Sequence, residues 1–222
     1  MQKQPATNGS HSPHAELFVD DPTSNRSCGT ISFGRNESIY EEGDPAVCFY
    51  KVKSGAVRSC KVLVDGRRQI TGFYFVDDIF GVEPGLAHRL SAEATRATRA
   101  VAYLQPGSAG GLSRLDDHLS RDAIASAVTD LGRSHEHAIL LGRKTAIEKV
   151  ASFLLDTAER MRSDTFELPM SRLDIADHLG TTIETVSRIM AKLARDGVIT
   201  LQNGRRAIAL RNKAALCRLQ ES

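Results

Sequence analysis

The segment at residues 171–195, SRLDIADHLGTTIETVSRIMAKLAR, decides the fold of the C-terminal third of the chain. Its first nine residues have a helical pattern, with Ser171 as the N-cap and Asp174 at the capping-box position. Gly180 ends this helix in a tight turn, and one of the two threonines that follow caps a second helix over 183–195. The pattern predicts a helix-turn-helix whose helices share an apolar core: Ile175, Ala176, Leu179, Val186, Ile189, Met190 and Leu193.

A hairpin pattern follows the second helix. Residues 198–202 (VITLQ) and 205–210 (RRAIAL) flank Asn203-Gly204, and Asn-Gly between apolar runs is the strongest short-range hairpin signal. A hairpin directly after a helix-turn-helix is a wing. Its tip carries Arg205 and Arg206, which we predict to contact DNA phosphates.

The second helix has an apolar side and, opposite it, a polar side. We expect Ile183, the first residue of the helix, to belong to the buried, apolar side. Glu184, Ser187 and Arg188 lie on the polar side, near the end that enters the major groove in helix-turn-helix proteins. Arginine can bond O6 and N7 of guanine, glutamate can accept from a cytosine amino group, and serine can reach a base edge or a phosphate. We therefore predict that these three residues read bases.

Another interpretation of this side is structural. Glu184 and Arg188 stand four residues apart and can form a surface ion pair worth ~0.3–0.5 kcal/mol. Both interpretations can hold, since such a pair can order the arginine for its base. Around the base-reading residues we predict phosphate contacts from Ser171, Thr182, Thr185 and Lys192, in addition to the wing arginines Arg205 and Arg206.

A long helix is predicted upstream, over residues 112–142, because no proline interrupts the chain between Leu112 and Met161. It carries a heptad seam with 4-3-4-3 spacing, formed by Ile124, Val128, Leu131, His135 and Ala138. The stripe is narrow and its flanks are polar, so we favour a dimer seam over an ordinary core-facing helix. His135 is expected to pack there rather than bind a metal. We expect a break at Gly142 and then a second amphipathic helix. The residues on its inner side are Ala146, Val150, Phe153, Leu154 and Met161.

The N-terminal half has short strand-like runs separated by turns, for example at 38–40, 47–52, 55–58 and 69–75. Closely spaced short strands indicate a β-sandwich or barrel. The expected class is therefore α+β, with a β-roll of the jelly-roll, cyclic-nucleotide-binding-like kind, a long dimerisation helix and a winged helix-turn-helix. The expected boundaries are a flexible arm at 1–27, the β-roll at 28–111, the helix at 112–142 and the DNA-binding domain at 143–222.

Charge and hydropathy agree with this division. Net charge is −2 over residues 1–142 and +4 over 143–222, so the basic excess lies where a polyanion would bind. No apolar run approaches the roughly 20 residues that span a bilayer, and the first residues lack the apolar core of a secretory signal. We expect a cytoplasmic protein with no membrane partner.

Motifs for metal or catalytic chemistry are missing from the sequence. Cys28, Cys48, Cys60 and Cys217 are scattered without a CxxC pair, so buried, inert thiols are expected. No Gly-rich phosphate loop, metal motif or nucleophile elbow occurs. The chain is not expected to be an enzyme or to bind a metal.

The segments IADHLG (175–180), IETVSR (183–188) and LARDGVI (193–199) resemble the Crp/Fnr family of bacterial transcription regulators. The segments EGDPA (42–46) and YKVKSGAV (50–57) resemble that family's β-roll. The resemblance implies a homodimer that binds double-stranded DNA and recruits RNA polymerase, as an activator more often than a repressor. Glu-x-x-Ser-Arg in the second helix resembles the Fnr and FixK branches, which implies a TTGAT-N4-ATCAA type of palindrome read by Glu184, Ser187 and Arg188.

The same resemblance bears on the sensor. Fnr proteins bind an iron–sulfur cluster through four cysteines, three of them clustered near the N-terminus. This chain has Cys28 alone in that region, so no such cluster is expected. The family's cyclic-nucleotide motif is interrupted within 81–91, although Glu83, Arg89 and Ser91 are present. A FixK-like regulator of microaerobic, respiratory and nitrogen-fixation genes without a cofactor is therefore expected. The alternative is a regulator gated by a cyclic nucleotide or haem.

Two smaller expectations follow from the resemblance. Ser171 stands near the place where some FixK-like members carry a redox-reactive cysteine, so no thiol switch is expected there. The turn at 65–68 (DGRR) is a candidate polymerase contact, and an ordinary surface turn is the simpler interpretation.

Overall fold

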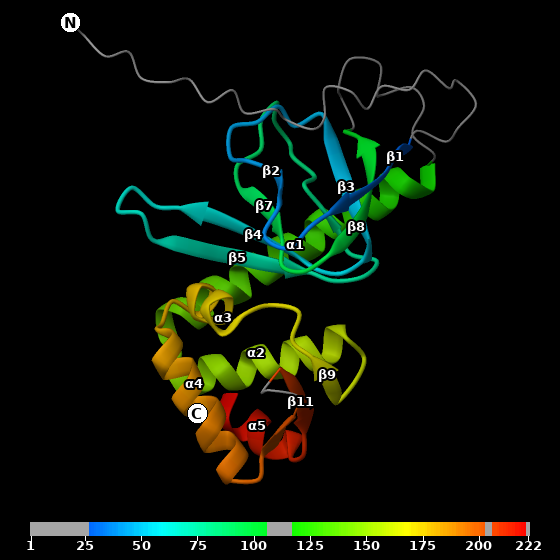
Figure 1. The fold of residues 1–222 in the computed structure, drawn as a ribbon. Coiled ribbons are helices and arrows are strands. Elements are labelled where there is room, and N and C mark those ends of the chain that lie inside the picture. The colour runs from blue at the N-terminus through cyan, green and yellow to red at the C-terminus, as the bar shows by residue number, and fades with distance from the viewer. Residues whose placement is uncertain (1–26, 106–116, 203–205, 221–222) are drawn as a thin grey trace, which may run out of the picture.

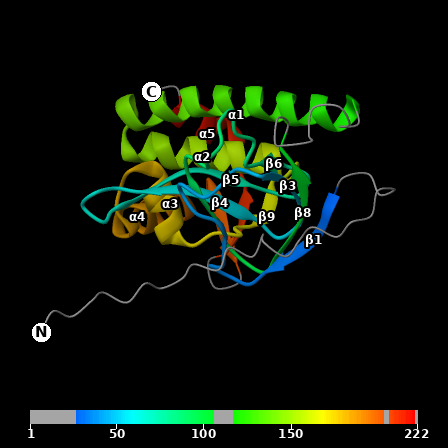
Figure 2. The ribbon, with the colours of Figure 1, turned by 90° about the horizontal axis from the view of Figure 1, so that it is seen from above.

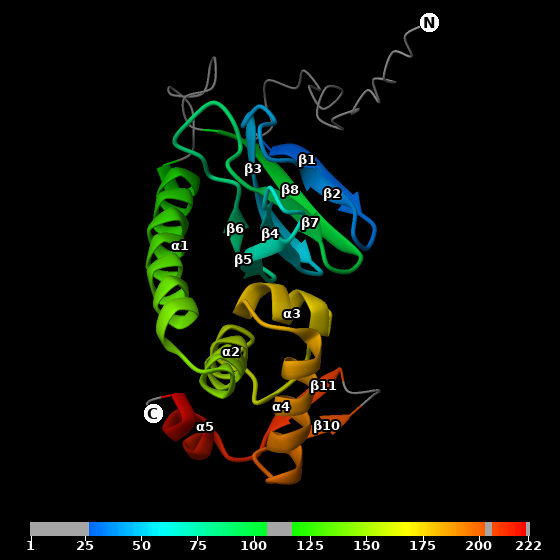
Figure 3. The same cartoon turned by 90° about the vertical axis from the view of Figure 1, so that its left-hand side faces the viewer.

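The computed structural model describes residues 27–105, 117–202 and 206–220. A β-roll forms the upper half of the molecule and a helical domain with a small sheet forms the lower half (Figure 1). The long helix α1 (Asp117–Arg143) runs along one side of the roll and leads down to the lower domain (Figure 3). No helix in the described ranges is both long and apolar enough to cross a membrane.

The roll consists of two four-stranded antiparallel sheets. Their facing sides bury aromatic rings, among which Tyr50 stacks on Phe80 at 5.3 Å and on Tyr40 at 5.8 Å between ring centroids. The first sheet has the order β1 (Ser27–Phe33), β8 (Thr98–Leu104), β3 (Cys48–Ser54), β6 (Ile79–Phe80). The second has the order β2 (Ser38–Tyr40), β7 (Ser91–Ala94), β4 (Val57–Val62), β5 (Arg68–Tyr74).

Helix α1 packs on the roll along one face. Ala123 is buried with Phe49 and Ile79, and the hydroxyl of Ser126 donates to the carbonyl of Ile79 at 3.0 Å. Helix α2 (Ala146–Arg160) begins almost at once after α1, with Thr145 as N-cap, so the chain turns close to Gly142 as expected. Helix α2 lies below the roll, near the lower end of α1 (Figure 3), and Figure 2 shows the molecule from above.

The lower domain is a helix-turn-helix completed by a three-stranded sheet in the order β10-β11-β9. Its core joins buried residues of α2, α3 and α4, including Leu154, Ile175 and Met190. Helix α5, which packs against α2, was not predicted from the sequence. The elements after α2 are β9 (Thr165–Glu167), α3 (Arg172–Leu179), α4 (Ile183–Arg195), β10 (Ile199–Gln202), β11 (Ala207–Leu210) and α5 (Lys213–Gln220).

The expected β-roll, long helix and winged helix-turn-helix are confirmed as an α+β fold. The exact domain boundaries stay predictions, because residues 1–26 and 106–116 lie outside the described ranges. One detail was wrong: Ile183 is 39% exposed rather than buried. It is the first residue of α4 and precedes the turn that packs on α3.

Candidate nucleic-acid interface

The helix pair is fixed locally by its caps. The backbone N–H of Asp174 donates to Ser171 Oγ at 3.0 Å, and Ser171 N–H donates to Asp174 Oδ2 at 2.9 Å, which completes the capping box of α3. Gly180 ends α3 in the left-handed region at φ 59°, where glycine carries no Cβ penalty. Thr182 caps α4 by accepting the N–H of Thr185 at 3.2 Å. These contacts set the angle between the two helices.

Helix α4 has one buried and one exposed side. Val186, Met190 and Leu193 are each at most 1% exposed and pack into the domain core. Glu184, Ser187 and Arg188 are exposed on the opposite side. Within the part of the chain that the structure describes, Glu184 and Arg188 form no ion pair with each other. Their charged groups therefore face solvent, where a macromolecular partner can reach them.

Those predicted phosphate-contacting residues that the structure describes differ in their exposure and in the hydrogen bonds of their side chains. Lys192 and Arg206 are exposed. The hydroxyl of Thr185 lies 3.2 Å from that of Thr182. The Ser171 hydroxyl already donates to Asp174 Oδ2 at 2.8 Å. Arg205 lies outside the described residues.

The predicted dimer seam lies on the face of α1 that points away from the roll. Ile124, Val128 and Leu131 are 62%, 65% and 57% exposed, and His135 and Ala138 are exposed as well. Ile139, at 60% exposure, extends the stripe. These side chains therefore do not serve this chain's own core. An unpartnered apolar stripe of this kind is typical of an association surface.

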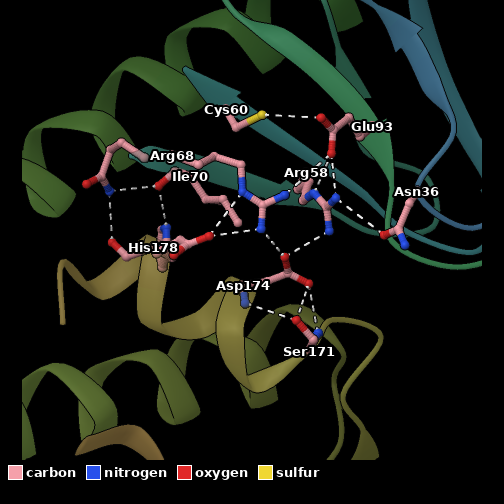
Figure 4. Close-up of polar contacts among 11 residues, drawn as sticks. Asn36, Arg58, Cys60, Arg68, Ile70, Glu93, Ser171, Asp174 and His178 are labelled. Carbon is pink, nitrogen blue, oxygen red and sulfur yellow. Dashed lines mark hydrogen bonds and ion pairs between the residues drawn. The ribbon is translucent and has the colours of Figure 1, made fainter. Parts of the chain in front are cut away.

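A cluster of charged residues joins α3 to the roll, and the sequence did not predict it (Figure 4). Arg58 of β4 and Arg68 of β5 both donate to Asp174 Oδ1 at 2.8 Å. The interpretation of residues 65–68 as a free surface turn was therefore wrong for Arg68, whose side chain is 23% exposed and bonded across the domains. Partners 106 and 116 residues apart leave no local pattern in a sequence.

The nucleotide-like residues of the roll do not converge on an anion. The Ser91 hydroxyl accepts the N–H of Glu42 at 3.0 Å. Glu83 accepts the N–H of Arg89 at 3.1 Å, and the Arg89 side chain is 75% exposed. The His88 ring stacks on Tyr40 with 3.6 Å between centroids. Ser91 and Glu83 thus accept from backbone N–H groups of the roll, and the Arg89 side chain extends into solvent.

The cysteines differ in environment. Cys48 and Cys60 are buried, as expected, but Cys217 is exposed on the short helix α5, which contradicts the expectation for that thiol. The sulfur of Cys28 lies 3.9 Å from that of Cys48, and this contact lowers the pKa of Cys28 to about 7. Among the residues placed in the structure, no three His, Cys, Asp or Glu side chains are arranged to bind a metal.

Comparisons with protein-family models match both halves of the chain. The Crp-like helix-turn-helix domain matches residues 148–219, and the cyclic nucleotide-binding domain matches residues 30–109. The helix-turn-helix match contains all of α3 and α4.

Individual relatives extend over most of the chain. It is 44% identical to the nitrogen fixation regulation protein FixK of Azorhizobium caulinodans, over 84% of this chain and 77% of that protein. It is 40% identical to the FixK protein of Rhizobium meliloti, over 75% of this chain and 76% of that protein. The solved structure of FixK2 from Bradyrhizobium japonicum superposes with a TM-score of 0.81 at 41% identity, covering 87% of this chain and 98% of that one.

Proposed function

The chain belongs to the Crp/Fnr family of transcription regulators, in which it is FixK-like, and on that premise we propose that it reads a palindrome of the TTGAT-N4-ATCAA type as a homodimer. The observation that carries the proposal is the exposed side of α4. Glu184, Ser187 and Arg188 are exposed there, and this exposure supports base reading by the three residues. Regulators of this family are not enzymes, and the chemistry needed is recognition alone.

The charges on α4 suit the one G·C pair of each half-site. Arg188 can donate two hydrogen bonds to O6 and N7 of the guanine, and Glu184 can accept from the amino group of a cytosine. The two residues are about one helical turn apart, so both can face the same groove. Ser187, between them in sequence, reaches a neighbouring base edge or phosphate.

Phosphate contacts would hold α4 in register. Lys192 and Arg206 are exposed and charged, and Thr182 and Thr185 lie at the N-terminal end of α4, where the helix dipole favours an anion. Ser171 and the wing residue Arg205 complete the proposed set. These contacts give affinity that falls with salt and carry no sequence information.

Dimerisation would bring two α4 helices to one face of the DNA. The stripe Ile124, Val128, Leu131, His135 and Ala138 is exposed and has the spacing of a parallel helix pair. Two recognition helices then meet successive major grooves about 34 Å apart, which demands a palindrome.

The test is binding of the full chain to three labelled duplexes, followed by fluorescence anisotropy. The duplexes are the palindrome, the palindrome with both G·C pairs replaced by A·T, and a scrambled control. We expect roughly a hundredfold weaker binding without the two G·C pairs, since each mismatched pair costs ~1–3 kcal/mol. Equal affinity for all three duplexes would refute base reading by α4.

Regulation of transcription follows from the family, and its direction is proposed here as activation in the cytoplasm of microaerobic, respiratory and nitrogen-fixation genes. The FixK proteins that this chain resembles are named for regulation of nitrogen fixation, and a 34% identical relative from Rhodopseudomonas palustris is named a transcriptional activatory protein. RNA polymerase would contact the tip of the β4–β5 hairpin, where Val64 is fully exposed.

Transcription from a promoter that carries the palindrome tests this part. We expect the full chain to increase transcript yield with purified RNA polymerase, and Val64→Ser to lose that increase while it binds DNA normally. A fall in transcript yield on addition of the protein would instead identify a repressor.

A ligand-gated regulator is the second candidate, and one observation favours it. A cavity of about 800 Å³ lies between the roll, α1 and α2, and is lined in part by Glu83, Arg89, Asp130 and Arg160. Thermal unfolding with cyclic AMP or cyclic GMP, and the visible spectrum after addition of haem, separate the candidates. If a ligand raises the melting temperature and DNA binding requires that ligand, the result favours gating. If the ligand leaves the melting temperature unchanged and DNA binding does not need it, the result favours the first proposal.

A further inference from the structure

Helix α3 is held on the roll by a group of charged and polar residues that we name the α3–roll cluster: Asn36, Arg58, Arg68, Glu93, Asp174 and Asp177 (Figure 4). At its centre, the side chains of Arg58 and Asp174 are only 6% and 5% exposed. Arg58 Nη1 donates to Asp174 Oδ1 at 2.8 Å, while its Nε donates to Glu93 Oε2 at 2.9 Å. One guanidinium thus joins a strand carboxylate to a helix carboxylate.

Arg68 repeats this connection from the neighbouring strand. Its Nη2 donates to Asp174 Oδ1 at 2.8 Å and to Asp177 Oδ2 at 2.9 Å, and its Nε donates to Asp177 Oδ2 at 3.0 Å. Asp174 and Asp177 are three residues apart and so lie on one face of α3. A planar guanidinium that meets two carboxylates on one helix face restrains rotation of the helix about its axis.

The two oxygens of Asp174 have separate tasks. Oδ2 accepts from the backbone and the hydroxyl of Ser171 and completes the helix cap. Oδ1 accepts from Arg58 and Arg68 of the roll. Asp174 therefore both completes the N-terminal cap of α3 and ties the helix to the roll.

The other end of α3 is also tethered. The ring Nδ1–H of His178 donates to the carbonyl of Ile70 at 3.1 Å, and the Gln69 side chain donates to the carbonyl of His178 at 3.2 Å. From α1, His137 Nε2–H donates to the same carbonyl at 2.8 Å and its ring stacks on that of His178. With both ends fixed, α3 cannot tilt relative to the roll without breaking buried bonds.

Helices α3 and α4 form one packed unit, because Ile175 and Leu179 of α3 share a core with Val186 and Met190 of α4. Fixing α3 on the roll therefore also fixes the direction of the recognition helix relative to α1. In a dimer joined through α1, that direction sets the distance between the two recognition helices.

We propose that Arg58 and Arg68 are positioning residues for DNA recognition, which set the half-site spacing that the dimer accepts by holding Asp174 and Asp177. The proposal rests on the proposed function, because spacing has meaning only for a dimer on a palindrome. Buried ion pairs add little net stability compared with apolar packing, so conformational specificity is the better explanation of the α3–roll cluster. One base pair shifts a half-site by about 3.4 Å along the axis and also rotates it, so small errors in direction matter.

The test measures binding to palindromes whose spacer is varied from two to six base pairs. Arg68→Gln and Asp177→Asn are the variants, because these side chains are partly exposed and their loss is compatible with folding; Arg99→Gln, an exposed arginine on β8, is the matched control. We expect wild type and Arg99→Gln to prefer one spacer over its neighbours by about tenfold or more. In Arg68→Gln and Asp177→Asn that preference should fall to about threefold or less, with unchanged base preference within a half-site.

The outcomes separate positioning from stability. Urea unfolding of each variant shows whether it is folded at the temperature of the binding assay. A folded Arg68→Gln that keeps the wild-type spacer preference, whether or not its unfolding midpoint has dropped, would overturn the proposal. Failure of the wild-type chain to distinguish the half-site from scrambled DNA would overturn the proposed function instead.

Discussion

The two helices of the helix-turn-helix share one apolar core and differ in what their polar side chains do. On α3, Asp174 and Asp177 accept hydrogen bonds from arginines of the roll. On α4, Glu184 and Arg188 are exposed, and in the described structure they are not paired with each other. Both helices are short and capped by a hydroxyl, so the difference lies in their surroundings. The charges of α3 are bonded to the roll, and those of α4 are exposed to solvent.

The difference has an energetic side. A carboxylate that is 5% exposed, such as Asp174, depends on its partners, because an unpaired buried charge costs several kcal/mol. An exposed carboxylate such as Glu184 is solvated and contributes little to folding. Stability should therefore respond to changes on α3, and DNA recognition to changes on α4.

The largest effect is expected when the two copies of α4 are separated. Leu131→Glu places a charge in the apolar stripe of α1 and should prevent dimerisation. Without the second recognition helix, affinity for the palindrome should fall about a thousandfold, ~4 kcal/mol.

Sedimentation and fluorescence anisotropy check this result. Leu86→Glu, at a side chain 90% exposed on a loop of the roll, is the control and should leave both measurements unchanged. A Leu131→Glu protein that remains dimeric would show that this stripe is not the dimer surface.

The comparison of α3 and α4 is sharpest for Asp174→Asn against Glu184→Gln. The first change removes the charge that two guanidiniums share and should lower the free energy of unfolding by about 3 kcal/mol. The second removes only an exposed charge in the first turn of α4, and the loss should be less than about 1 kcal/mol. Urea unfolding measures both, and similar losses in the two variants would contradict the distinction.

The next effect concerns DNA alone. Arg188→Ala should weaken binding to the palindrome by ~1–3 kcal/mol per half-site and relax discrimination at one base pair. Its unfolding free energy should stay close to that of wild type, because Arg188 is exposed. Fluorescence anisotropy with duplexes altered at each position of the half-site measures this discrimination. If Arg188→Ala still discriminates at the G·C pair, Arg188 does not read that base.

The smallest effect is a pH dependence at the end of α3. Burial and the adjacent His137 lower the pKa of His178 to about 3, below its ordinary value of 6.5. The unfolded chain therefore binds more protons, so the stability that neutral His178 provides is present above pH 6.5 and is lost as pH falls toward 3. By pH 5.5 the loss should be about 1 kcal/mol, measured by urea unfolding.

His178→Gln identifies the source of this slope. Glutamine keeps a side-chain donor for the Ile70 carbonyl but cannot take up a proton in this range. Its unfolding free energy should change less than that of wild type between pH 7 and 5.5. Parallel curves for the two proteins would assign the dependence to other groups.

The local features of this structure could be predicted from sequence patterns. The capping box of Ser171 and Asp174, the turn at Gly180 and the two sides of α4 each depend on residues at most a few positions apart. Such patterns also indicated the β-roll and the wing. They could not reveal that Asp174 serves a second set of bonds, because Arg58 and Arg68 come from strands more than 100 residues away.

Exposure was harder to predict than periodicity. Ile183 has the right position in the apolar pattern of α4 but lies before the packed turn, so it remains 39% exposed. Arg68 belongs to a turn-like sequence, yet it is bonded to α3. Both errors arise because tertiary packing, and not local order, decides which side chain is covered.

Selection of bound DNA from a random pool tests the central claim most directly, namely that the exposed side of α4 reads bases while α3 is held on the roll. The full chain should enrich two inverted half-sites of the TTGAT type with a single spacer length. Arg188→Ala should enrich the same spacer with a degenerate G·C position. No enriched motif with the wild-type chain, or an unchanged motif with Arg188→Ala, would contradict it.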